Sequence, residues 1–110
     1  LRTDPELACY SVSKHALIGL VQAAAAEAAA WGIRVNAVCP GAVATPMTAA
    51  ADTAPGGALA RLHPVGRVGT AEDIAELVVF LASARASFIT GAAYPVDGGL
   101  TSVAVPRYRG

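Results

Sequence analysis

Residues 32–46 read GIRVNAVCPGAVATP, and this stretch decides the fold. Its first half, Ile33 to Cys39, is a short apolar run, which favours a strand buried in a parallel sheet. Alternate residues of this strand share one face: Ile33, Val35, Ala37 and Cys39. The Pro40-Gly41 pair then breaks the strand, and the chain continues into a loop that carries Thr45.

A long helix is expected before this strand, from about Tyr10 to Trp31, with Gly32 as its C-terminal stop. Tyr10 and Lys14 lie one helical turn apart, so their side chains can meet. An ammonium beside a phenol lowers the pKa of the phenol from its ordinary value near 10, which makes a tyrosine a usable proton donor and acceptor. The same spacing also arises by chance, with the lysine stem lying along a half-buried ring.

The helix has two distinct faces. The face expected to lie toward a sheet holds Tyr10, Lys14, Leu17, Val21, Ala24 and Ala28. The other is a stripe of small residues, over which a second helix can approach closely: Ala16, Gly19, Ala23, Ala26 and Ala30. High helix propensity alone also explains such an alanine run.

The second half of the chain alternates a loop, a helix and a strand. Residues 45–63 are rich in Ala, Thr, Gly and Pro, which indicates a loop with short helical pieces. Thr70 is a good N-cap with Asp73 three residues later. The helix that follows has a core-facing stripe of Ile74, Leu77, Val78 and Leu81. Residues 92–96 indicate a last strand, in which Pro95 favours a sheet edge, and Asp97-Gly98-Gly99 indicates a turn.

Three segments, Tyr10 to Lys14, residues 32–46 and residues 91–99, resemble in their order and separation the C-terminal half of a classical short-chain dehydrogenase/reductase. The resemblance covers nearly the whole chain. It implies an α/β fold, the C-terminal part of a Rossmann-like doubly wound parallel sheet. It also implies that residues 1–110 are a partial domain whose N-terminal dinucleotide-binding half is absent, since no G-x-G-x-x-G motif occurs.

The resemblance implies roles for particular residues. Tyr10 would exchange a proton with the substrate oxygen, and Lys14 would hold the nicotinamide ribose and lower the pKa of Tyr10. The loop would wrap the nicotinamide end of the cofactor. In it Pro40 begins the segment, Gly41 allows close backbone approach, the Val43 backbone pairs with the carboxamide, and Thr45 adds a hydroxyl. The family's catalytic serine and asparagine would lie before Leu1, and Ser11 and Ser13 do not replace them.

The implied function is that of a fragment of an NAD(P)-dependent oxidoreductase, which moves hydride between the nicotinamide and a small-molecule alcohol or ketone. NAD or NADP is the expected cofactor, and the fragment alone is expected to be inactive. Residues 45–63 would be a substrate lid using Met47, Leu59 and Leu62, or only a surface loop. The small-residue stripe implies a homodimer or homotetramer. The alternative is a non-catalytic truncated protein or pseudoenzyme that acts as an oligomerisation module.

The composition of the chain argues against several other classes of protein. The chain has 110 residues, is 55% hydrophobic and 15% charged, has a mean hydropathy of +0.51 and carries no net charge. This is apolar for a self-sufficient domain of its size, which favours a fragment with faces that a further segment covers. Scattered arginines give no basic patch, so a nucleic acid is not expected as partner. The stretch from Leu17 to Trp31 is too short and too polar to span a membrane.

No metal site is expected from the histidines and cysteines. His15 and His63 are far apart, without a cluster of carboxylates or thiolates, and are expected to be surface or loop residues. Cys9 and Cys39 lack metal spacing and favour reduced thiols in a cytoplasmic protein, with Cys39 a small buried hydrophobe. The sequence leaves the role of residues 107–109 open.

Overall fold

The computed structural model describes residues 5–45 and 53–101, and for residues 5–11 the backbone alone. Predictions made for Met47 and for residues 107–109 therefore fall outside the described residues. The chain divides into two compact parts. One consists of residues 1–37 and 86–93, and the other of residues 38–85 and 94–110.

Helix α1 spans Pro5–Ala28 and continues into a turn of 3-10 helix at Ala29–Trp31. The expected start near Tyr10 is wrong, because the helix already begins at Pro5, where the fixed φ of proline suits the first turn. The expected stop is confirmed. Gly32 has φ 70°, and the Gly32 and Ile33 amides donate to the Ala29 and Ala28 carbonyls at 3.0 and 3.2 Å. This pair of hydrogen bonds is a Schellman motif, and glycine adopts its left-handed conformation without strain.

The residues of α1 that are buried differ from those expected to face a sheet. Val21 and Ala25 are buried, whereas Leu17, expected on the same face as Val21, is 41% exposed. Ala25 is buried because the backbone of Gly91 comes close to it, and a Cβ on Gly91 would lie 3.5 Å from the Ala25 Cβ. The small-residue stripe is exposed in this chain: Ala16, Gly19, Ala23, Ala26 and Ala30.

The segment from Ile33 to Asn36, which lies between α1 and the first strand, is bonded through side chains to residues 89–92. The Asn36 amide donates to the Ile89 carbonyl at 3.0 Å and accepts from the Ala92 N–H at 3.3 Å. The Val35 N–H donates to the Thr90 hydroxyl. The Gly91 N–H also donates to the Val35 carbonyl at 2.7 Å, so side-chain and backbone bonds are mixed before the regular ladder. The strand starts later than expected, at Ala37, and Ile33, predicted to be buried, is 55% exposed.

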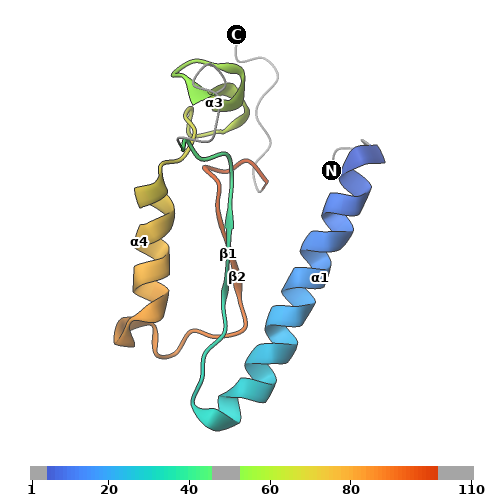
Figure 1. The fold of residues 1–110 in the computed structure, drawn as a ribbon, viewed down its shortest axis with the longest axis vertical. Helices are drawn as coiled ribbons and strands as arrows, with labels where there is room; N and C mark the ends of the chain where they lie inside the picture. Colours follow the sequence, from blue (N-terminus) through green and yellow to red (C-terminus); the bar gives the residue numbers. More distant parts are fainter. Residues whose placement is uncertain (1–4, 46–52, 102–110) are drawn as a thin grey trace. The chain divides into compact units, whose positions relative to one another are not determined.

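Strands β1 (Ala37–Pro40) and β2 (Ala93–Val96) pair in a two-stranded sheet (Figure 1). The Ala37 N–H donates to the Ala92 carbonyl at 2.9 Å, and the Gly41 N–H donates to the Val96 carbonyl at 3.1 Å. From the first bond to the second, the residue numbers rise along both strands, so the strands are parallel. Cys39 is buried as expected. The observed β2 matches the predicted last strand within one residue.

Helices α3 (Ala58–Leu62) and α4 (Ala71–Ala82) lie in the connection from β1 to β2. A crossover that carries a helix between two parallel strands is a βαβ unit, so the predicted α/β class is confirmed. The N-cap prediction for α4 is also confirmed. The Thr70 hydroxyl accepts from the Asp73 N–H at 3.1 Å, while the Asp73 carboxylate accepts from the Thr70 N–H at 2.8 Å.

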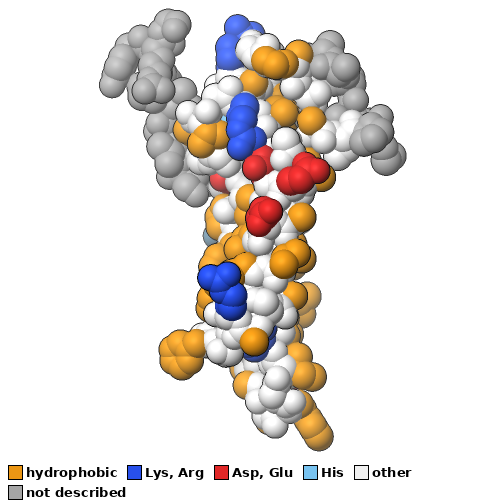
Figure 2. Space-filling model, turned by 90° about the vertical axis from the view of Figure 1, so that its left-hand side faces the viewer, with side chains coloured by type: hydrophobic (Ala, Val, Ile, Leu, Met, Phe, Trp, Pro, Cys, Tyr) orange, Lys and Arg blue, Asp and Glu red, His pale blue; other side chains and the backbone are white. Residues whose placement is uncertain are grey.

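The predicted core stripe of α4 is confirmed only in part. Leu81 is buried and Ile74 and Leu77 are half-buried, but Val78 is 47% exposed. Figure 2 shows acidic side chains gathered on the face on which α4 lies, with hydrophobic side chains along it. Val79 and Phe80 add to this exposed apolar surface. Among the helices that the described residues form, none has the length and apolar character needed to cross a membrane.

We predict that Asp73→Asn lowers the unfolding temperature of the full-length protein at neutral pH. Hydrogen bonds from the Arg67 guanidinium and the Thr70 amide hold the pKa of Asp73 well below its usual range. The stabilisation is therefore complete above the unfolded-state pKa of about 3.9, and it is lost as the pH falls through the lower folded-state pKa. Calorimetry should find the widest gap between wild type and variant above about pH 5 and a closing gap below about pH 4.

Glu76→Gln is the control, because Glu76 is an exposed acid on the same helix that takes no part in the cap. Equal losses in both variants would contradict the assignment of the stabilisation to the cap and its ion pair.

Candidate active site

The loop that follows β1 is held along one edge by hydrogen bonds to two segments. The Ala42 N–H donates to His63 Nε2 at 3.2 Å, and the Ala42 carbonyl accepts from the Gly69 N–H at 2.8 Å. The Ala44 N–H donates to the Gly69 carbonyl at 2.9 Å, which forms a parallel bridge between Val43 and Gly69. The loop that the resemblance assigns to the cofactor is thus an extended, fastened segment.

The bridge also determines how the Val43 backbone is directed. In an extended segment, successive residues point their N–H and C=O groups to opposite sides. Because the Ala42 carbonyl and the Ala44 N–H both point to Gly69, the N–H and C=O of Val43 point away from it. Val43 therefore offers one donor and one acceptor side by side on the other edge of the loop.

Gly41 is enclosed by the protein itself. A Cβ at this position would lie 2.9 Å from both Cα and Cβ of Asp97 and 3.0 Å from His63 Nε2. These distances are shorter than ordinary van der Waals contact, so no larger residue fits without a backbone shift. The close approach that requires glycine here is therefore intramolecular.

His63, predicted to be a surface or loop residue, lies in the loop directly after α3, but it is only 3% exposed and so is not on the surface. Its Nδ1 lies 2.6 Å from the Leu59 carbonyl oxygen, while its Nε2 faces the Ala42 N–H. A carbonyl only accepts and an amide N–H only donates, so the imidazole is neutral with its proton on Nδ1. Sequence reasoning missed this residue because a single histidine has no pattern that reveals a partner 21 positions away.

Asp97 forms the predicted turn and is also buried, with 7% of its surface exposed. Its carboxylate accepts from the Gly99 N–H at 3.0 Å and from the N–H and hydroxyl of Thr101. Gly98 and Gly99 have φ of 59° and 90°, the left-handed region that favours glycine. The carboxylate is thus used to close the turn after β2.

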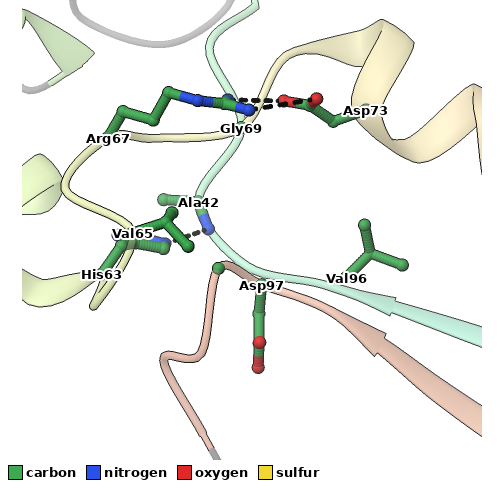
Figure 3. Close-up of a pocket in the computed structure, with 9 residues that line it drawn as sticks. Ala42, His63, Val65, Arg67, Gly69, Asp73, Val96 and Asp97 are labelled. Atoms are coloured by element: carbon green, nitrogen blue, oxygen red, sulfur yellow. Dashed lines mark hydrogen bonds and ion pairs between the residues drawn. The ribbon is translucent and has the colours of Figure 1, made fainter. Parts of the chain in front are cut away.

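A hollow of about 210 Å³ lies between the loop after β1, residues 63–73 and the turn after β2 (Figure 3). Its lining includes Ala42, His63, Arg67, Asp73 and Asp97. The Arg67 guanidinium binds both oxygens of Asp73, at 2.7 and 3.3 Å. Figure 3 shows the Asp97 carboxylate directed away from this ion pair. The charged groups that border the hollow are therefore engaged with the protein itself.

The other predicted site residues are placed as follows. Pro40 is the last residue of β1 and is exposed. Thr45 is also exposed, and it already interacts with another group of the protein. Tyr10 and Lys14 both lie within α1, where Lys14 is half-buried. The helix and the loop belong to different parts of the chain. Within the described residues, no group of three or more His, Cys, Asp or Glu could hold a metal ion.

A family model described as enoyl-(acyl carrier protein) reductase matches residues 1–101. The 2-(S)-hydroxypropyl-CoM dehydrogenase 3 of Xanthobacter autotrophicus is 46% identical over 105 residues, which are 90% of this chain and 41% of the relative. The chain belongs to the short-chain dehydrogenase/reductase family.

Solved structures agree with this assignment. Acetoin dehydrogenase from Salmonella typhimurium superposes with a TM-score of 0.77 and 40% identity over 97% of this chain and 42% of its own. A blue fluorescent protein from a metagenomic library, solved in complex with NADPH, superposes with a TM-score of 0.72 and 38% identity over 84% of this chain and 37% of its own. The predicted Rossmann-like α/β fold is therefore confirmed. The chain spans about two fifths of the length of these relatives.

We predict that Gly41→Ala destabilises the full-length protein by about 1–3 kcal/mol, since the new methyl group would meet the Asp97 backbone. Gly69→Ala is the matched control in the same bonded segment, because its Cβ would meet its nearest neighbour, the Ala42 carbonyl oxygen, at 3.4 Å. Chemical denaturation of both variants tests the difference. A similar small loss in both would show that the loop moves freely away from Asp97.

Proposed function

We propose that the full-length protein is an NAD(P)-dependent oxidoreductase that transfers hydride between the nicotinamide and a small-molecule alcohol or ketone. Membership of the short-chain dehydrogenase/reductase family carries this proposal. The dehydrogenase relatives support the reaction class, and the relative solved with NADPH supports the cofactor. Residues 1–110 would be the C-terminal part of the catalytic domain.

The free edge of Val43 fits a nicotinamide carboxamide. A primary amide has one carbonyl acceptor and one N–H₂ donor side by side, which complement the N–H and C=O of a single extended residue. Because the opposite edge of the loop is bonded to Gly69 and His63, this pair is held in a fixed direction. Fixed direction matters, since hydride transfer requires one face of the nicotinamide ring to be held against the substrate carbon. Pro40, Gly41 and Thr45 would complete the cofactor contacts.

Tyr10 and Lys14 would carry the proton chemistry. They are four residues apart in α1, a spacing at which side chains on a helix are neighbours. Tyr10 would donate a proton to the carbonyl oxygen in reduction and accept one from the alcohol in oxidation. The Lys14 ammonium would stabilise the phenolate and bind the ribose, so the same residue serves the acid and the cofactor.

Exposed apolar side chains support a larger assembly. Large hydrophobic residues are exposed on both α1 and α4, among them Leu20, Val79 and Phe80. Exposed apolar residues on the surface of a helix commonly mark an interface. We propose that further sequence of the full-length protein and a second subunit cover these faces, in a cytoplasmic homodimer or homotetramer.

We predict that Tyr10→Phe reduces turnover of the full-length protein by at least about 100-fold, because only the proton-carrying oxygen is removed. Cofactor affinity, followed by the fluorescence of NADH or NADPH, should change little. Tyr94→Phe is the matched control, since Tyr94 lies in β2 and has no role in the proposed chemistry.

Turnover of Tyr10→Phe close to that of wild type would overturn the role of Tyr10. Cofactor binding by wild type without turnover of any alcohol or ketone would favour the non-catalytic alternative.

A further inference from the structure

We propose that His63 is a positioning residue for the cofactor loop, which it holds through the Ala42 N–H so that Val43 presents its donor and acceptor in a fixed direction. The inference rests on the proposed function and extends it. It assigns a role to a residue outside both the Tyr10-Lys14 pair and the loop itself.

The first observation is the burial of an imidazole with both nitrogens engaged. His63 is 3% exposed, and its two ring nitrogens face the Leu59 carbonyl and the Ala42 N–H. Leu59 lies in α3 and precedes His63 by one helical turn, so this bond fixes the ring orientation. The ring then presents Nε2 as an acceptor at one place only, which is the amide of Ala42.

The second observation is that the backbone around His63 is anchored to the turn after β2. The Val65 N–H donates to the Gly98 carbonyl at 3.1 Å, and the Gly66 N–H donates to the His63 carbonyl at 2.7 Å. A Cβ on Gly98 would lie 3.6 Å from the His63 Cβ, so this turn packs against the histidine. His63 therefore links two segments, the loop after β1 and the turn after β2.

The third observation is the arrangement of bonds along the loop. Gly41 donates to Val96, Ala42 donates to His63, and Ala42 and Ala44 bond to Gly69. The His63 bond is the one in this series that a side chain supplies. It holds the Gly41–Ala42 peptide, which directly precedes the Ala42–Val43 peptide that carries the Val43 N–H. Its loss would therefore loosen the backbone on one side of the peptide that directs the Val43 N–H.

Two substitutions separate the two bonds of the imidazole. In His63→Gln, the side-chain Oε1 takes the place of Nε2 and still accepts from Ala42, while the bond to Leu59 is lost. In His63→Asn, the side-chain Nδ2 takes the place of Nδ1 and still donates to Leu59, while the bond to Ala42 is lost. Each variant loses one hydrogen bond, so thermal unfolding provides a comparison of their stabilities.

The experiment measures KM for NADH and NADPH and kcat in the full-length protein. We expect His63→Asn to raise the cofactor KM about tenfold and His63→Gln to keep it within about threefold of wild type. Equal effects in the two variants, or a KM that follows their unfolding temperatures, would overturn the proposal.

Amide hydrogen exchange at Ala42 provides a readout that needs no turnover. The Ala42 N–H should exchange about tenfold faster in His63→Asn than in His63→Gln, which should resemble wild type. Unchanged protection in His63→Asn would overturn the inference. A wild-type protein without activity but with this exchange pattern would instead overturn the proposed function and leave the His63 contact established.

Discussion

The backbone of Ala42 is the constraint on which the candidate site depends. Its N–H is bound by the His63 side chain and its carbonyl by the Gly69 N–H, so two segments meet at one residue on the same edge of the loop. Backbone polar groups that are shielded from water need such partners, because leaving one unpaired costs free energy comparable to a lost hydrogen bond. The loop after β1 therefore has a fixed direction although it lies outside the strand.

The support for the Ala42 backbone extends into α4. Asp73 caps the helix and binds Arg67 with both carboxylate oxygens, and the segment between Arg67 and Thr70 contains Gly69. The Asp73 carboxylate thus orders both the start of α4 and the short segment whose Gly69 backbone bonds to the loop after β1. On the other side, the buried Asp97 closes the turn that packs against His63. The two acids have structural roles, which leaves the proposed proton chemistry to Tyr10.

Predictions from the sequence succeeded where one local pattern determines the outcome. Gly32 ends α1, Thr70 and Asp73 cap α4, and Asp97 with two glycines forms a turn, because each of these structures involves only residues close in the chain. Predictions failed where distant contacts decide. The strand begins only at Ala37, after a stretch in which the Asn36 and Thr90 side chains supply bonds to the facing segment, and Ile33 is exposed. Val78 is exposed although it follows the helical period.

The sequence by itself determined the family, the order of helices and strands, and the residues proposed for proton transfer, since these are patterns of residue type and spacing. Only the tertiary structure decided that His63 is buried, that Gly41 is enclosed by Asp97, and that Val43 directs its polar groups away from Gly69. Each of these depends on a contact between segments far apart in the chain. Such contacts leave no periodic pattern in the sequence, because two residues can pack or form a hydrogen bond at any separation along the chain.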